Sequence, residues 1–121
     1  MTVKINTKDG QIELTDDVIA TVVGGATTEI FGVVGMASKS AIKDNFQALL
    51  RKENYSKGVV IKTLEDGRIA VDVYTVMSYG VKISEVSRNI QERVKFNLES
   101  QLGISVDAVN VFIQNIKTPI D

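Results

Sequence analysis

The segment with the clearest chemical potential is the glycine-bracketed tetrad Gly32–Gly35 (G-V-V-G), which Lys39 and Ser40 follow closely. A nucleotide-binding P-loop has the pattern G-x-x-x-x-G-K-[ST], in which backbone amides and the lysine surround the phosphates. In this chain Ser38 stands where the glycine before the lysine is required. The P-loop pattern is therefore not met, and the segment is not predicted to bind a nucleotide.

The same tetrad fits the GXXG loop with which K-homology modules clamp four nucleotides. One version of that fold also shares the order of elements predicted below. Neither central residue is basic, whereas a clamp on phosphates benefits from positive charge. Val33, Val34 and Met36 are side chains that favour burial. We interpret the tetrad as a turn leading into a buried extended segment, and keep a nucleic-acid-binding module as the alternative.

Positive charge is concentrated in residues 39–62, whose local net charge is +4 in a chain with a net charge of −1. Lys39, Lys43 and Arg51 are spaced so that a helix would place them on one ridge. A solvated helix surface is the ordinary explanation; RNA, an anionic membrane surface or an acidic protein are the functional ones. Together with Tyr79, these three residues are our candidate contacts for a partner or an anion.

Catalytic and metal-binding chemistry is limited by composition, because the chain has no histidine and no cysteine. A Ser-His-Asp triad, a thiolate nucleophile and a typical zinc site are impossible. The acidic pairs at 16–17 and 65–66 are explained by a helix start and a turn, and Asp72 is expected to face solvent from a strand. We predict no enzyme, no catalytic residue, no metal site and no cofactor; a carboxylate site for a divalent ion is the third alternative.

Hydrophobic periodicity predicts the elements that must position these residues. Helices are expected after Thr15, which is a suitable N-cap, and over 40–53 and 83–102. Strands are expected at 11–14, with a further one at 3–6, on both sides of the turn at Asp66-Gly67, and over 104–117. The order β-α-α-β-β-α-β predicts one α+β domain over 1–121. Its architecture is a two-layer sandwich with the helices packed on one face of a mixed sheet.

Two helices carry patterns that the structure can test. The first is expected to pack closely through Gly25 of the pair Gly24-Gly25, with a local break of the helix as the alternative. Its buried stripe comprises Val18, Val22, Ala26 and Ile30, widened by Ile19 and Val23. The last helix is expected to end at Gly103, and its i+4 ladder comprises Val86, Ile90, Val94, Leu98 and Leu102. No stretch approaches the roughly 18 apolar residues of a membrane-spanning helix. We expect a cytoplasmic protein that reaches a membrane only through a partner or a peripheral contact.

The order and spacing of six segments resemble the alkaline shock, or general-stress, envelope protein family of Gram-positive bacteria, formerly a domain of unknown function. The segments are G-Q-I-E-L (10–14), E-I-F-G-V-V-G-M-A (29–37), K-G-V-V-I (57–61), V-D-V-Y-T-V-M-S-Y-G (71–80), I-S-E-V-S-R-N-I-Q-E-R-V (83–94) and V-N-V-F-I (109–113). They extend over nearly the whole chain. The pair Gly24-Gly25 departs from the alanine-rich first helix expected of the family.

The resemblance implies a non-enzymatic protein of cell-envelope stress or homeostasis that acts as a scaffold or regulator through protein–protein contacts. Some relatives collect beneath the membrane through an integral-membrane partner, and others are associated with fatty-acid metabolism. This chain is similar to the short branch found beside a fatty-acid or dihydroxyacetone kinase-like protein. The implied partner is a membrane-associated or lipid-metabolic protein; an oligomer is compatible with the resemblance, and nucleic acid is not expected. The family supplies no established catalytic residues.

Overall fold

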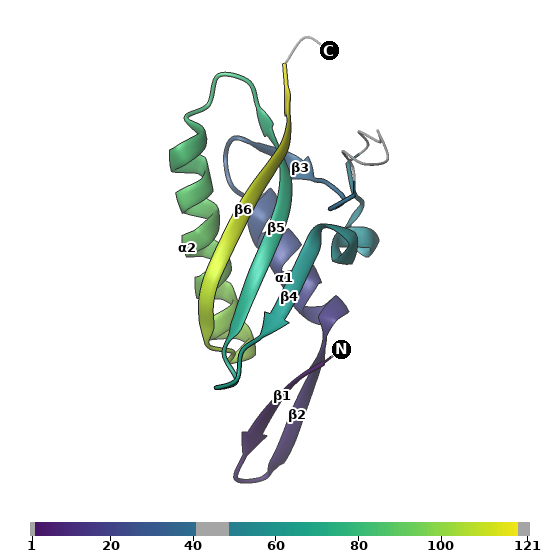
Figure 1. Ribbon diagram of the computed structural model, residues 1–121, viewed down its shortest axis with the longest axis vertical. Coiled ribbons are helices and arrows are strands. Elements are labelled where there is room, and N and C mark those ends of the chain that lie inside the picture. Colours follow the sequence, from purple (N-terminus) through teal and green to yellow (C-terminus); the bar gives the residue numbers. More distant parts are fainter. Residues whose placement is uncertain (1, 41–48, 119–121) are drawn as a thin grey trace.

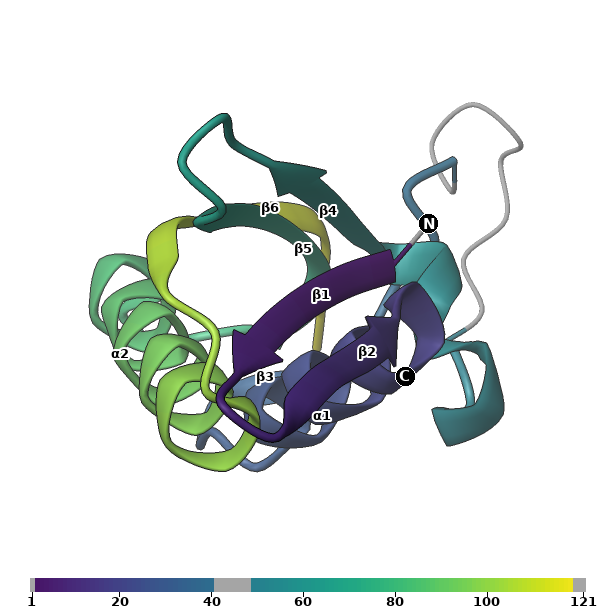
Figure 2. The same ribbon diagram turned by 90° about the horizontal axis from the view of Figure 1, so that it is seen from below.

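The computed structural model of the chain describes residues 2–40 and 49–118. Two helices, α1 (Asp16–Thr28) and α2 (Ile83–Leu102), lie on the same side of a sheet, so that the molecule has two layers (Figures 1 and 2). The sheet contains both parallel and antiparallel pairs. The predicted α+β sandwich with helices on one face of a mixed sheet is confirmed.

The sheet is built around β5 (Ile69–Ser78), whose inward side chains are almost all β-branched or otherwise apolar. β6 (Val106–Lys117) pairs parallel with β5 along its whole length. β4 (Val59–Thr63) and β3 (Val33–Met36) both pair antiparallel with β5, β4 with its first half and β3 with its second. Because β6 occupies one edge of β5, the two short strands share the other edge. The hairpin predicted around Asp66-Gly67 is the β4–β5 pair.

Helix α2 connects β5 to β6, as a parallel pair requires a crossover of this kind. The predicted ladder is confirmed: Val86, Ile90, Val94 and Leu98 are buried against the sheet and α1. Gly103 ends the helix in the left-handed conformation (φ 70°), and its N–H donates to the Leu98 carbonyl.

Helix α1 begins as predicted, because Thr15 Oγ1 accepts a hydrogen bond from the Val18 backbone N–H at 3.3 Å. Its buried face confirms part of the predicted stripe, because Ile19, Val23 and Ala26 are buried. Val18 is exposed, contrary to the prediction, whereas Ala20 and Thr27 are buried in addition. The buried face is thus rotated towards the contacts of α1 with α2 and with Lys52–Gly58.

The close packing expected at Gly25 occurs one residue earlier. A Cβ atom at Gly24 would overlap the Tyr55 ring, whereas nothing lies within 4 Å of a Cβ at Gly25. Tyr55 belongs to a 3₁₀ helix, η1 (Lys52–Gly58), that lies against α1. Of the two glycines, only Gly24 is required by packing, because the absence of a side chain there lets the Tyr55 ring approach the helix backbone.

The N-terminal strands β1 (Thr2–Thr7) and β2 (Gly10–Thr15) form the predicted hairpin, as a separate two-stranded sheet. Val3 and Leu14 lie opposite each other near its base and pack against the core, as does Ile5. The turn end of the hairpin extends beyond the body of the molecule (Figure 1).

The second helix, predicted over 40–53, falls mainly on residues 41–48, which lie outside the described part of the chain. Its predicted last turn is wrong, because residues 49–51 are not helical and η1 begins at Lys52. The Leu50 N–H donates to the Met36 carbonyl at 2.9 Å. Leu50 therefore bonds to the last residue of β3 and not to a carbonyl of a preceding helical turn.

Candidate functional site

The first candidate site residue is Phe31, at the tip of a tight turn between α1 and β3. The Val33 N–H donates to the Ile30 carbonyl at 3.1 Å, which closes a four-residue turn with Phe31 and Gly32 at its centre. Gly32 has a φ of 100°, as the third position of a type II turn requires. Because Phe31 is at the outer corner of this turn, 89% of its surface is exposed.

The same turn explains the two glycines of the tetrad. A Cβ at Gly32 would lie 2.9 Å from Val86 Cγ2, so the turn packs tightly on the first part of α2. Gly35 is buried in β3, where a Cβ would lie 3.2 Å from the Leu49 side chain. The predicted turn leading into an extended segment is confirmed, and Gly35 and Met36 are buried, but Val34 is 39% exposed rather than buried. The tetrad does not form the loop between two helices that a K-homology clamp uses, because Val33–Met36 form β3 and pair with β5.

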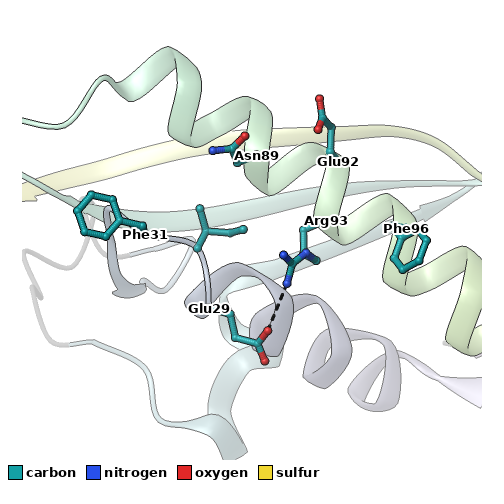
Figure 3. Close-up of a pocket in the computed structure, with 7 residues that line it drawn as sticks. Glu29, Phe31, Asn89, Glu92, Arg93 and Phe96 are labelled. Atoms are coloured by element: carbon teal, nitrogen blue, oxygen red, sulfur yellow. Dashed lines mark hydrogen bonds and ion pairs between the residues drawn. The ribbon is translucent and has the colours of Figure 1, made fainter.

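Phe31 borders a surface depression of about 500 Å³ between the end of α1 and the outer face of α2. In Figure 3, Phe31 lies on one side of this depression and Phe96 on the other, with Arg93 and Glu29 between them. Phe96 is 67% exposed, although it belongs to the middle of a long helix. The two phenylalanines therefore present apolar surface to solvent across a shared hollow.

A second depression of about 470 Å³ adjoins the first, and both are lined by Phe31 and Asn89. It lies over the connection from β5 to α2, and Tyr79, which is 67% exposed, contributes to its wall. The Tyr79 backbone N–H donates to the Lys117 carbonyl at 2.8 Å, which holds this position against the end of β6. We call the two joined depressions the Phe31 groove.

The charged groups of the Phe31 groove lie mainly on α2. Arg93 Nη1 lies 3.5 Å from Glu29 Oε2, an exposed pair that is expected to contribute little to stability. Glu92 lines the first depression, and Glu85 lines the second together with Lys82, which precedes α2. The groove thus combines aromatic anchors with a polar rim, the composition of a protein-binding surface.

The candidate contacts inferred from sequence are distributed over different parts of the molecule. Tyr79 lies in the Phe31 groove. Lys39 and Arg51 are exposed near η1, and the Lys39 N–H donates to the Lys57 carbonyl at 2.9 Å. Lys43 lies outside the described residues. Among the described members of the proposed basic ridge, none lines the groove, since η1 and α2 lie towards opposite edges of the sheet (Figure 1).

Asp72 corrects one expectation, because it does not face solvent freely and is only 6% exposed. Its Oδ1 accepts a hydrogen bond from Asn110 Nδ2 at 2.9 Å, and its Oδ2 lies 3.2 Å from Lys62 Nζ. Asn110 and Lys62 come from the two strands that flank β5. The carboxylate therefore joins three neighbouring strands and is satisfied by them.

Sequence reasoning did not identify Phe31 and Phe96 as site residues. The available signal was their position: Phe31 lies beside the glycine that turns the chain, and Phe96 lies off the buried ladder of α2. Neither observation alone places the two rings beside one groove, because that requires the packing of α1 against α2.

Acidic side chains do not form a metal-binding cluster in the described part of the chain. Within residues 2–40 and 49–118, no three of them gather closely enough to hold a metal ion. No helix in these two ranges has the length and apolar character needed to cross a membrane.

The fold and the groove define an α+β sandwich protein with an aromatic surface groove. Comparison with known proteins then gives its family: the chain belongs to the alkaline shock protein family, described as having a cell envelope-related function, which matches residues 4–118. The resemblance found in the six sequence segments is thereby confirmed.

Relatives occur in Gram-positive bacteria. The uncharacterized protein Spy1614 of Streptococcus pyogenes serotype M6 is 83% identical over 117 residues, covering 97% of this chain and 96% of its own. The uncharacterized protein YloU of Bacillus subtilis is 45% identical, covering 97% of both chains. The uncharacterized protein YqhY of B. subtilis is 32% identical over 89% of this chain and 78% of its own. No solved structure matches the chain significantly.

Proposed function

We propose that this protein is a non-enzymatic scaffold or regulator of cell-envelope homeostasis that binds a protein partner through the Phe31 groove. The partner is a membrane-associated or lipid-metabolic protein, and the complex forms on the cytoplasmic side of the envelope. One observation carries the proposal: Phe31, Tyr79 and Phe96 are exposed by 89%, 67% and 67% around two adjoining depressions that share Phe31 and Asn89.

Large exposed aromatic side chains lose the most apolar surface when a partner covers them. Aromatic residues are also enriched among the few side chains that carry most of the binding energy of protein interfaces. Three of them around one groove therefore favour recognition of another protein. The family's cell envelope-related function supports a partner in that part of the cell.

The groove is also rigid enough to bind without large reorganisation. The turn that carries Phe31 is closed by the Val33–Ile30 hydrogen bond, and the Ser78 N–H donates to the Gly32 carbonyl at 2.8 Å. Phe96 is held by a helix whose opposite face is buried. Pre-organised anchors of this kind bind with a smaller loss of conformational entropy.

The test is affinity capture from a streptococcal or Bacillus lysate with the full chain as bait. Wild-type protein is expected to retain an envelope or lipid-metabolism protein, and a Phe31→Ser, Phe96→Ser double variant is expected to lose it. Ile12→Ser is the matched control, because Ile12 is an exposed apolar residue of the N-terminal hairpin, away from the groove.

Capture that persists in the double variant would assign binding to another surface. Recovery of no envelope or lipid-metabolism protein by the wild-type bait would argue against the function itself. Circular dichroism of each variant checks that the fold is unchanged, so a loss of capture can be attributed to the missing rings.

A further inference from the structure

The outer edge of β6 is a second surface, separate from the Phe31 groove. β6 is 12 residues long and pairs with β5 along one edge; within residues 2–40 and 49–118, no strand pairs with its other edge. Figure 1 shows β6 at the margin of the sheet. An unpaired strand edge offers main-chain N–H and C=O groups to another strand.

Natural edge strands are usually protected by shortness, charges, proline or β-bulges, which prevent such pairing. The register of β6 with β5 shifts at Asp107 and Gln114, and the stretch between these positions, residues 108–113, is regular. β6 has charged side chains only near its ends, at Asp107 and Lys117. Between and beside them, Phe112, Ile113 and Ile116 are exposed by 42%, 36% and 42%. The strand is long and uncharged in its middle, and it exposes Phe112 on one face and Ile113 and Ile116 on the other. These features are those of an interface.

We infer that β6 pairs antiparallel with β6 of a second copy of this chain, which extends the sheet across a two-fold axis. Charge complementarity favours a second copy of the chain as the partner of the β6 edge. The two charges stand at opposite ends of the strand, so antiparallel pairing brings Asp107 of each copy towards Lys117 of the other, whereas parallel pairing would align like charges. Asp107 already binds Arg68 of its own chain at 2.7 Å, and Lys117 makes no ion pair within the described residues.

The register follows from the ladder with β5. Asp107 and Gln114 are extra residues with no opposite partner in β5. We count the register of the dimer without Asp107 and Gln114. If the two-fold axis passes at Phe112, Val111 then lies opposite Ile113 of the other copy, and Val109 lies opposite its Ile116. Each pair joins side chains on the same face of the sheet, as an antiparallel ladder requires.

Phe112 then lies opposite its own copy on the face that the helices leave open. It stacks there on Tyr74, with ring centroids 4.8 Å apart and an angle of 14° between the planes. Two such stacks would meet at the axis and cover one another's exposed apolar surface. Side chains satisfy main-chain groups of both residues of the Val109–Ile116 pair: Gln91 Nε2 donates to the Val109 carbonyl at 2.9 Å, and Asn115 Oδ1 accepts from the Ile116 N–H at 2.9 Å. The dimer requires main-chain partners to replace these two side chains.

The test uses sedimentation velocity of the full 13.2 kDa chain over a concentration series. Wild-type protein is expected to form a dimer. Phe112→Lys and Phe112→Glu each place like charges opposite one another at the axis, so each alone is expected to raise the dimer dissociation constant about tenfold or more. An equimolar mixture of the two variants is expected to recover the dimer, because opposite charges then meet.

Recovery in the mixture also shows that both variants fold. Ile12→Lys, an equivalent change on the N-terminal hairpin, is the control and is expected to leave the dimer intact. A wild-type chain that is monomeric at every concentration would overturn the inference. So would an oligomer that persists in Phe112→Lys, or a mixture that associates no better than either variant alone.

Discussion

At the scale of single residues, two adjacent glycines allow a matched experiment on packing. Gly24 and Gly25 both lie inside α1, where replacing glycine by alanine normally stabilises a helix by about 0.5–1 kcal/mol. We expect Gly25→Ala to show this gain, because no atom lies within 4 Å of the added Cβ. Gly24→Ala is expected to lower the free energy of unfolding by about 1–3 kcal/mol, since the Tyr55 ring must move.

Urea denaturation followed by circular dichroism measures both changes. If Gly24→Ala stabilises as much as Gly25→Ala, the Tyr55 ring does not rest on the helix backbone. Gly24→Ala combined with Tyr55→Ala would separate the overlap from other effects, because removal of the ring should recover part of the loss.

A second residue-scale prediction concerns the stability cost of alanine at Gly32, with alanine at Gly67 as the control. Both have positive φ angles, 100° and 88°, so alanine at either position is expected to cost about 1–2 kcal/mol through the backbone. Only Gly32 also faces Val86 and Val81 of the α2 region, whereas Gly67 has open space around it. Gly32→Ala is therefore expected to lower the free energy of unfolding by roughly 1 kcal/mol or more beyond the loss caused by Gly67→Ala, as measured by urea denaturation. Equal losses would show that the turn does not pack on α2.

At the scale of elements, the periodic patterns were predictable and the long-range contacts were not. The α2 ladder and the β4–β5 hairpin follow from local spacing, since Val86 to Leu98 repeats at i+4 and the hairpin turns at Asp66-Gly67. β3 has only four residues, one of them a glycine, and its pairing depends on β5 more than 30 residues later. No local pattern specifies such a strand.

The burial of Asp72 shows the same limit. An aspartate on the outward side of a strand is expected to face water, and its exposure here is low because Asn110 is its neighbour across the parallel β5–β6 pair. The register of the β5–β6 pair is set by the crossover through α2, so the sequence of the β4–β5 hairpin alone could not predict it. For the candidate site, Tyr79 was identified in advance, whereas Phe31 and Phe96 required the packing of α1 on α2.

An element-scale prediction concerns Arg68, which links the β4–β5 turn to β6. Its Nε lies 2.7 Å from Asp66 Oδ2 and its Nη1 lies 2.7 Å from Asp107 Oδ1. Hydrogen bonds from the Arg68 side chain and backbone hold the pKa of Asp66 below its usual value of 3.8. A depressed carboxylate pKa means that the interaction stabilises the fold above the unfolded-state pKa and is lost as the pH falls through the folded-state value.

Arg68→Gln is therefore expected to raise the pKa of Asp66 towards its usual value and to reduce the acid sensitivity of the turn below about pH 4. Carbon-13 NMR titration of the aspartate carboxyl groups measures the change directly. Arg88→Gln, on the exposed side of α2, is the control and should leave the Asp66 titration unchanged. An Asp66 titration that is the same with and without Arg68 would contradict the assignment.

At the scale of the whole molecule, the hairpin and the sheet differ in how they are supported. β5 is paired on both edges and the helices cover one of its faces, so we expect its amides to reach solvent only through global unfolding. Among the strands of the described residues, β1 and β2 pair with no strand but each other, and a two-stranded hairpin is marginally stable by itself. The hairpin is tied to the core near its base, through Val3, Ile5 and Leu14.

Native-state hydrogen exchange should therefore separate two levels of stability. Amides of Val71 and Val73 are expected to exchange with the free energy of global unfolding, and those of Asn6 and Gln11 roughly two or more orders of magnitude faster, through local opening. Val3→Ala should release the base and accelerate exchange throughout the hairpin, while the exchange of β5 changes only with the small loss of global stability. Hairpin amides as slow as those of β5 would show instead that the two sheets unfold as one unit, because some further contact then holds the hairpin closed along its whole length.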